Sequence, residues 1–415
     1  MVRRWTAWRV YPLLLLLLVV CYNGCMHMHS VETHPHRMLL KNKHNDFEHL
    51  RILAFGTSRT FGVGVNHQHK AFPSLISRNN TKNVAMKASG PQYSALCTQT
   101  MVGDDGLYDV ILFEYNLLAD DYLMILARRL RARFPQATMI FMRIWLPFQF
   151  RHVPSNKAVL QLLHERFGPA PSKPATELLA SLIEGTQPED WIFLESWEKK
   201  KLLERVATEV GGYVYHMPRP DNAIEALTTY ARFYTPDVNH YTQAGHRFLQ
   251  QQLVKVMHEL KAQRTSELGA WHNTDVCELW YETGTLAIQH EAPIVKFLNT
   301  RYALELATSE SYLMTKNPFP DRSVSVWIDF MSGSPTGQYP KSRIRLEDQS
   351  PVKINPRLKG KGELHVMKHA YVGMLEQSAA AKLTVKALDG DAFNPFRIVG
   401  VAYTTIHVEN GQAIV

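Results

Sequence analysis

The chain has 415 residues, which is too long for one ordinary domain and comfortable for two cores. Apolar residues make up 45% and charged residues 20%, so the chain is neither disordered nor collagen-like. The formal net charge is +8. The four cysteines are too few for a disulfide scaffold, and none has the C-x-x-C spacing of a zinc site, so we expect no metal and no cofactor.

Residues 1–30 have the layout of a targeting segment. Arg3, Arg4 and Arg9 precede an almost unbroken apolar run at residues 10–22, the order of charge and hydrophobicity found in a secretory signal. The run is short beside the roughly 20 residues that a spanning helix needs, so a cleaved signal peptide and an uncleaved signal-anchor both stay open. We expect a protein of the secretory pathway, either secreted or held as a single-pass type II protein in the Golgi or cell-surface membrane.

The next segment is rich in histidine. Residues 26–48 show little apolar periodicity, which favours a solvated stalk over a metal site. The sequon Asn79-Asn80-Thr81 agrees with a luminal location. In an oxidising compartment Cys97 and Cys277 could form a disulfide, although the sequence gives no geometry for the pair.

Strand and helix patterns alternate from residue 50 to about residue 263. Short apolar runs indicate strands at residues 51–55, 83–88, 109–114, 138–145 and 212–216. Amphipathic runs indicate helices at residues 120–134, 197–210 and 242–263. This alternation predicts an α/β fold, with a parallel sheet covered by helices on both faces.

The pattern changes after residue 266. Strand candidates at residues 323–330, 363–366, 371–375, 382–388 and 397–408 are separated by short turns rich in Gly, Pro, Asp and Asn, which indicates an antiparallel sandwich. We therefore divide the chain into a signal peptide or signal-anchor (1–25), a stalk (26–48), an α/β domain (49–265), a linker (266–285) and a β-sandwich-like domain (286–415).

A Gly-x-Ser-x-Thr-x-Gly motif, residues 56–62, stands where the first strand ends. A serine at this place, Ser58, projects from the carboxyl edge of the sheet, where open α/β sheets bind ligands. A phosphate-binding loop is excluded because no lysine follows a correctly spaced glycine. A plain strand-to-helix turn would show the same small residues.

Three further positions follow later strands. Gly90 would let a ligand approach its backbone amide, and Asn116 could donate to an oxyanion or cap a helix. Asp237 and His240 precede the last long helix in an Asp-x-x-His spacing. A hydrolytic serine needs a base, and the base needs an orienting carboxylate. His240 and His246 are a poor metal pair because they do not share a helix face.

In this order the residues resemble the SGNH hydrolase superfamily, the GDSL-type esterases and lipases. The family's first block, Gly-Asp-Ser-x-Thr-x-Gly, is similar to residues 56–62. Its later blocks are similar to Gly90, to Asn116, to Asp237 with His240, and to the downstream Gly245 and His246. The resemblance covers about residues 50–263, roughly half the chain. It implies a flavodoxin-like three-layer α/β/α fold, to which this chain adds a C-terminal β-sandwich-like domain.

The resemblance also implies a role for each residue. Ser58 would be the nucleophile, His240 its base and Asp237 the carboxylate that orients the base. The backbone N–H groups of Ser58 and Gly90 and the side chain of Asn116 would form the oxyanion hole.

Two positions depart from the family pattern. Thr57 replaces the aspartate beside the nucleophile, and the third block, residues 114–117, lacks its glycine and its aspartate. Glu114, which begins that block, could bind a sugar hydroxyl or a cation, although a buried strand-end salt bridge is the more ordinary interpretation.

The sequence thus predicts an ester hydrolase acting on an ester-bearing glycan, with a lipid ester as second choice. A glycan O-acyltransferase with the same triad and a non-catalytic glycan-binding protein are the alternatives. The basic runs 128–133 and 199–201 could attract acidic polysaccharide or anionic lipid, but such runs are more often solvated helix faces. Aromatic residues could stack on sugars, with core packing as the default: Trp271, Trp280, Tyr281 and Trp327. We expect no nucleic acid as partner, and a membrane only through an uncleaved N-terminal segment.

Overall fold

The computed structural model describes residues 47–414, apart from internal gaps. The gaps are residues 66, 105, 116–117, 145–196, 219–230, 236–239, 261–274, 281–289, 291, 298–300, 307–309, 334–338, 358–364, 389–394 and 410–411. The predicted signal segment and most of the stalk therefore lie outside the described residues. Within the described ranges, no helix is long and apolar enough to cross a membrane.

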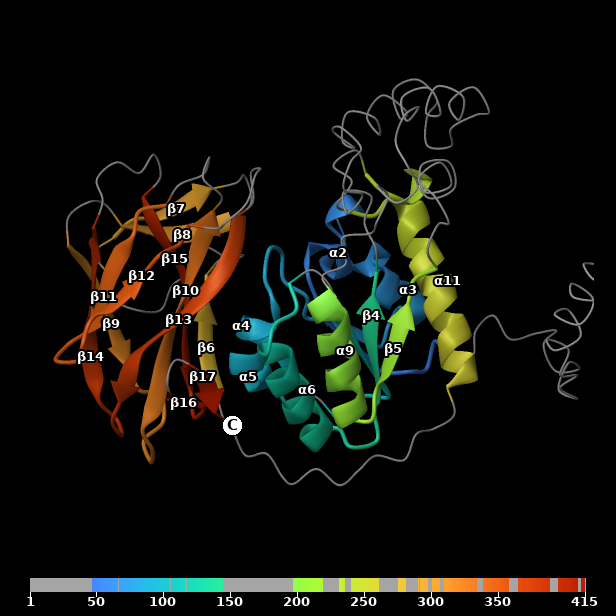
Figure 1. Ribbon diagram of the computed structural model, residues 1–415, viewed down its shortest axis with the longest axis horizontal. Coiled ribbons are helices and arrows are strands. Elements are labelled where there is room, and N and C mark those ends of the chain that lie inside the picture. Colours follow the sequence, from blue (N-terminus) through green and yellow to red (C-terminus); the bar gives the residue numbers. More distant parts are fainter. Residues whose placement is uncertain are drawn as a thin grey trace, which may run out of the picture. The chain divides into compact units, whose positions relative to one another are not determined.

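The first half of the described chain is built on a five-stranded parallel sheet (Figure 1). Its strands are β1 (Ile52–Gly56), β2 (Thr81–Asn83), β3 (Val110–Glu114), β4 (Thr138–Arg143) and β5 (Tyr213–His216). They lie in the order β2-β1-β3-β4-β5, and all neighbours are parallel. This is the order of a flavodoxin-like doubly wound sheet, so the predicted α/β class is confirmed.

Helices cover both faces of this sheet. Alternate side chains of β1 point to opposite faces, Ile52 into one core cluster and Leu53 into the other. On the first face pack α3 (Phe72–Ile76) and α11 (Gln243–Glu259). On the second pack α4 (Pro91–Leu96), α5 (Thr98–Val102), α6 (Tyr122–Arg133) and α9 (Trp197–Glu209). The result is three layers, which we call the α/β part.

Two local predictions in the α/β part were wrong. The strand expected at residues 83–88 is β2, which ends at Asn83, and the chain beyond it follows β1 only through single bonds such as Met86 N–H to the Gly56 carbonyl, 3.0 Å. The arginines of α6 are not a solvated face. Arg129 and Arg131 are buried. Arg131 donates to the carbonyls of Val210 and Ala137, both at 2.7 Å.

The second half of the described chain is antiparallel and forms two sheets, as expected. The larger sheet runs β13 (His365–Leu375), β10 (Val324–Gly333), β15 (Phe396–Thr404), β8 (Arg301–Leu306) and β7 (Ile294–Phe297), with β6 (Asp275–Leu279) also on β15. The smaller sheet runs β12 (Val352–Ile354), β11 (Ser342–Leu346), β14 (Ala380–Ala387) and β9 (Ser311–Lys316). A short pair, β16 (His407–Glu409) and β17 (Gln412–Ile414), follows. One hydrophobic core joins the two sheets, which we call the sandwich part.

The large sheet is buried on both faces. All ten residues of β10 are buried, although its apolar residues Val324, Val326, Ile328 and Phe330 alternate along the strand, a pattern that predicts one buried face. Val326 and Ile328 face the sandwich core, whereas Trp327 and Met331 belong to a second core cluster that includes residues of α4. The ring of Trp327 contacts that of Tyr122 in α6 edge to face. The two strands expected at 363–366 and 371–375 are one strand, β13, with a register shift opposite Val326 and Trp327. Strand β6 lies within the range assigned to the linker.

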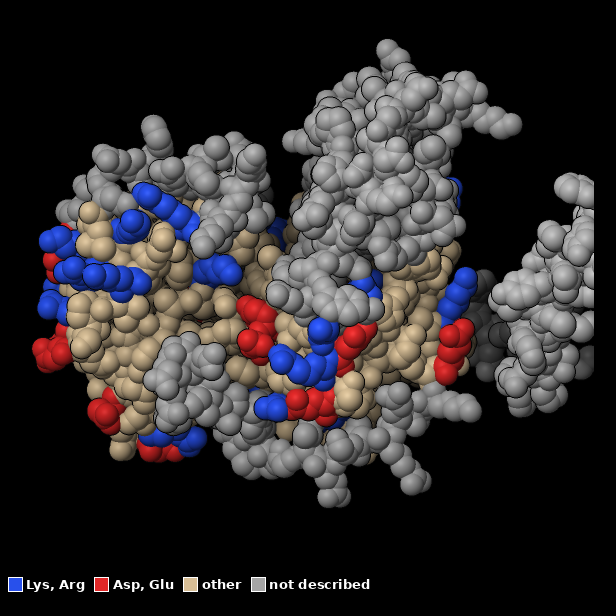
Figure 2. Space-filling view, viewed as in Figure 1, with Lys and Arg blue, Asp and Glu red and all other residues tan. Residues whose placement is uncertain are grey.

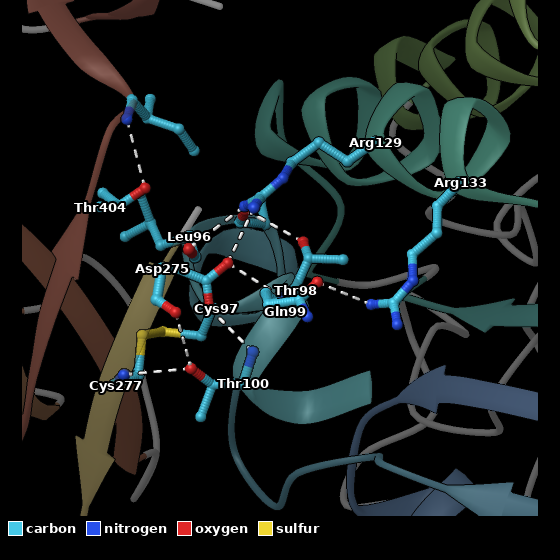
Figure 3. Close-up of polar contacts among 12 residues, drawn as sticks. Leu96, Cys97, Thr98, Gln99, Thr100, Arg129, Arg133, Asp275, Cys277 and Thr404 are labelled. Carbon is cyan, nitrogen blue, oxygen red and sulfur yellow. Dashed lines mark hydrogen bonds and ion pairs between the residues drawn. A yellow bond between two sulfur atoms is a disulfide. The ribbon is translucent and has the colours of Figure 1, made fainter. Parts of the chain in front are cut away.

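Polar and covalent bonds join the α/β part to β6 (Figure 3). Cys97 and Cys277 form a disulfide, which settles the pairing that the sequence left open. Asp275 is buried beside it, and its carboxylate accepts from the backbone N–H groups of Gln99 and Thr100 at 2.9 Å each. Arg129 completes the cluster with an ion pair of 2.7 Å to Asp275. The two parts are therefore held in register by more than apolar packing.

Candidate active site

The turn after β1 presents Ser58. Thr57 is extended, and the one-turn helix α2 begins at Ser58 and ends at Phe61. A Cβ on Gly56 would lie 2.3 Å from Thr60 Oγ1, so only glycine fits there. Gly62 ends the helix at φ +93°, a conformation that side chains strain. The glycines of the motif are thus requirements of a tight turn that leaves Ser58 half-buried.

The structure brings Ser58 and His240 together. Ser58 Oγ and His240 Nε2 are 2.8 Å apart, a hydrogen-bond distance. His240 is held just before α11 by a short antiparallel pairing. Its carbonyl accepts from the backbone N–H of Thr235 at 2.9 Å, and Tyr234 bridges Tyr241. Serine and imidazole are therefore placed by β1 and by the loop before α11, which are 182 residues apart in sequence.

The other predicted site residues fall into two groups. Asp237 and Asn116 lie outside the described residues. Gly90 is the N-cap of α4, and a Cβ added to it would lie 3.1 Å from the Leu118 carbonyl. Because Met86 is bonded to Gly56, the chain that leads to Gly90 leaves the sheet at the same edge as Ser58.

A buried ionic cluster lies beneath the turn that carries Ser58. The Glu114 side chain is fully buried and pairs with Arg59, with 3.1 Å between Oε1 and Nη2. Its Oε2 accepts from the hydroxyls of Thr57 at 2.7 Å and of Thr60 at 3.0 Å. We call these four residues the Glu114 cluster. It ties the end of β3 to both sides of Ser58, so Thr57 supports the turn where the family has aspartate.

Sequence reasoning found the position of Glu114 but not its partner. A glutamate that ends a wholly apolar strand must find a counter-charge if it is buried. Arg59, inside the serine motif and next to Ser58, was the available signal. The sequence left a sugar contact, a cation contact and a buried salt bridge open for Glu114, and the structure contains the salt bridge.

The downstream histidine of the last block is structural. His246 is buried, and its Nδ1 accepts from the backbone N–H of Phe72 at 3.2 Å, which joins α11 to α3. Burial, and then the neighbouring His240, lower its pKa from 6.5 to about 4. His246 is therefore neutral at physiological pH, and its Nδ1 is occupied by the hydrogen bond from Phe72.

A second carboxyl group lies close to Gly90. Asp120 Oδ2 is 4.0 Å from the place of a Gly90 Cβ. Burial raises the pKa of Asp120 to about 6, and Lys368 of β13 opposes that rise. The sandwich part thus contributes a charge on the Gly90 side of the site. Among the described residues, no three His, Cys, Asp or Glu side chains gather as a metal site would need.

Of the four aromatic residues considered for sugar stacking, the two that the structure describes are packed in cores. Trp280 is fully buried and Trp327 is 3% exposed. Trp280 donates its indole N–H to the Ile398 carbonyl at 3.0 Å. Trp271 and Tyr281 lie outside the described residues.

No protein-family model matches the chain, and no curated protein matches it. Among solved structures, its fold is similar to that of a two-domain esterase (CEX) active on acetylated mannans, co-crystallized with mannopentaose. The TM-score is 0.50 at 10% identity, over 87% of this chain and 92% of that chain. Another crystal structure of a two-domain esterase (CEX) active on acetylated mannans has a TM-score of 0.49 at 10% identity, over 85% of this chain and 90% of that chain. A family two carbohydrate esterase from Cellvibrio japonicus has a TM-score of 0.21 at 9% identity, over 34% of this chain and 35% of that chain. At such identities the likeness concerns the fold alone.

Proposed function

We propose that the chain is a serine ester hydrolase of the SGNH type that removes an O-acyl group, most simply acetyl, from a glycan. The observation that carries the proposal is the 2.8 Å contact between Ser58 Oγ and His240 Nε2 at the carboxyl edge of a flavodoxin-like sheet. The order of the sequence blocks supports it. So does the two-part fold shared with an esterase active on acetylated mannans.

In the first half of the reaction His240 Nε2 takes the proton from Ser58 Oγ as that oxygen attacks the ester carbonyl. Asp237 would hold the imidazole in the productive tautomer. The backbone N–H groups of Ser58 and Gly90 and the Asn116 amide would receive the developing oxyanion, each typically worth about 3 kcal/mol. The C–O bond to the sugar then breaks, and His240 returns the proton to the departing sugar oxygen.

In the second half water takes the place of the sugar. His240 removes a proton from the water, the resulting hydroxide attacks the acyl-serine, and the carboxylic acid leaves as Ser58 Oγ regains a proton. A second sugar hydroxyl in place of water would give acyl transfer by the same steps.

We also propose that the protein works in the secretory pathway or at the cell surface. The disulfide between Cys97 and Cys277 supports an oxidising compartment. The choice between a secreted form and a type II membrane form rests on the N-terminal segment and is part of this proposal.

The test is release of acetate from acetylated mannan and of 4-nitrophenol from its acetate by the purified full chain. Ser58→Ala should abolish both, because the other two hydroxyls at the turn, those of Thr57 and Thr60, are buried and bonded to Glu114. Ser350→Ala is the matched control, since Ser350 is an exposed serine of the sandwich part, and it should keep full activity.

Equal rates for Ser58→Ala and the unchanged chain would refute the serine mechanism. Inactivity of a folded unchanged chain on both esters, with binding to the mannan, would favour the non-catalytic alternative. Acetyl transfer to an added oligosaccharide that outruns acetate release would reassign the chain as an acyltransferase.

A further inference from the structure

The solvent face of the smaller sheet carries rows of positive charge. Along β11 and β14 residues alternate strictly between buried and less buried positions, so one face belongs to the core and the other to solvent. The solvent positions of β11, β12 and β14 hold Arg343, Arg345, Lys353, Lys382 and Lys386, all exposed. We call these five residues the basic face. Figure 2 shows Lys and Arg side chains gathered over this part of the sandwich.

The register places like charges directly opposite one another. Arg343 is paired across the sheet with Lys353 on one side and with Lys386 on the other. Opposed residues in antiparallel strands have Cβ atoms about 5 Å apart, and like charges there repel. The fold therefore keeps a three-strand row of cations that weakens it.

The described chain neutralises that row only in part. Arg343, Arg345, Lys353 and Lys386 make no ion pair or side-chain hydrogen bond with a described residue. Three exposed acids lie beside these cations, at or just beyond strand ends: Glu310, Glu347 and Asp348. Glu347 accepts a hydrogen bond from the backbone N–H of Lys382 at 3.3 Å. Five cations against three acids leave the face with an excess of positive charge that an anionic ligand can neutralise.

The basic face is hollowed. Two depressions of about 400 and 190 Å³ adjoin there and share Arg345, Pro351 and Thr384 in their lining. Arg343 and Lys386 line the smaller one and Lys382 the larger. The depressions thus follow one another across β11 and β14 rather than forming one closed pocket.

These features fit a linear polymer with repeated anionic groups. Guanidinium groups two residues apart on a strand lie about 7 Å apart on one face, and each can bind a carboxylate or sulfate group through paired N–H donors. Tyr312 and Thr384 lie between the cations, and the Lys382 ammonium covers the Tyr312 ring at 4.1 Å. Among the described residues, the exposed large apolar side chain nearest to this face is Leu388, just past the end of β14, and one such side chain gives little apolar area to bury in a lipid layer. Polysaccharide is therefore favoured over a membrane surface.

We infer that the basic face binds an anionic polysaccharide, sulfated or uronic-acid-rich, and so attaches the protein to a charged matrix. The large sheet, not this one, packs against the α/β part and its candidate site. The inference is independent of the esterase proposal, because it concerns another surface and its test involves no ester.

The test measures binding of the purified full chain to dextran sulfate and to polygalacturonate, with neutral dextran as blank. The variant Arg343→Gln/Arg345→Gln/Lys386→Gln should bind the polyanions at least about tenfold more weakly at low salt. The slope of log K against log salt should fall by about two, the size expected for three lost contacts to a flexible polyanion. Its melting temperature should be equal or higher, because repulsion has been removed.

A charge-matched control separates this face from net charge. Arg78→Gln/Arg247→Gln/Lys255→Gln removes two arginines and one lysine from exposed positions of the α/β part and should change binding less than about threefold. Equal weakening in both triple variants would overturn the inference, as would failure of the unchanged chain to bind either polymer. Tighter binding of phosphatidylserine vesicles or DNA than of the polysaccharides, lost in the first variant, would assign the face to another partner. Hydrolysis of 4-nitrophenyl acetate should be the same in both variants, whatever the fate of the esterase proposal.

Discussion

The substitution Glu114→Gln removes the negative charge of the Glu114 cluster with almost no change in side-chain size. The pair with Arg59 is almost wholly buried, at 0% and 3% side-chain exposure, so the change leaves a guanidinium inside the protein without its counter-charge. Loss of one partner of a buried pair costs about 3–5 kcal/mol. The hydroxyls of Thr57 and Thr60 also lose a charged acceptor. We expect the free energy of unfolding to fall by about 4 kcal/mol.

The same change should loosen the position of Ser58, the proposed nucleophile. Thr57 and Thr60 stand on either side of Ser58, and a displacement of about 1 Å at a reacting atom can cost about a hundredfold in rate. We expect kcat on 4-nitrophenyl acetate to fall by that order with little change in KM, because the turn, not the substrate pocket, is altered. Urea unfolding gives the stability, and steady-state kinetics give the two constants.

Two further variants make the reasoning refutable. Arg59→Met/Glu114→Gln removes both charges and should regain most of the lost stability while kcat stays low. Glu209→Gln breaks the half-exposed pair with Arg128 and should cost below about 1 kcal/mol. A Glu114→Gln protein within about 1 kcal/mol of the unchanged chain would refute the account. So would a double variant as unstable as the single one.

Two other predictions concern the carboxyl groups of Asp275 and Asp120. Asp275→Asn should lower the free energy of unfolding by about 3–5 kcal/mol in urea, because Arg129 is left buried, whereas Asp121→Asn at an exposed pair should cost under about 1 kcal/mol. The pKa of Asp120 is raised from 3.8 to about 6, so the folded state holds its proton more tightly and ionised Asp120 costs stability above pH 6. Asp120→Asn should therefore stabilise by up to about 3 kcal/mol at pH 8 and by almost nothing at pH 4, measured by thermal unfolding, and an equal effect at both pH values would contradict the pKa shift.

The sequence predicted those parts of the fold in which a local pattern dominates. A short apolar run such as residues 110–113 is typical of a buried strand, and it became part of β3 at the centre of the parallel sheet. The Gly-x-Ser-x-Thr-x-Gly spacing predicted a turn because steric limits at Gly56 and Gly62 act within seven residues. The serine and its histidine were predicted only through resemblance, since no local rule joins residues 182 positions apart.

The predictions failed where the burial of a residue depends on a surface that is distant in the sequence. Arg129 looked like one residue of a solvated run because its partner, Asp275, lies 146 residues further on. The alternation in β10 revealed one buried face, but the burial of Trp327 and Met331 depends on a helix of the other half of the chain. The same limit hid the basic face, because Arg343, Lys353 and Lys386 become neighbours only through strand register.

The larger sheet of the sandwich part contacts the α/β part near Gly90, whereas the smaller sheet turns one face to solvent. Ala88 has φ +54°, a left-handed conformation that costs a non-glycine residue about 1–2 kcal/mol. Its carbonyl accepts from the backbone N–H of Met367 in β13 at 2.7 Å, and Ser89 bridges Met367 as well. The larger sheet therefore holds the strained turn that leads to Gly90, the proposed oxyanion donor. A domain that contributed only ligand binding would not need that bond. The larger sheet is therefore part of the framework of the candidate site, while the smaller sheet keeps its charges turned to solvent.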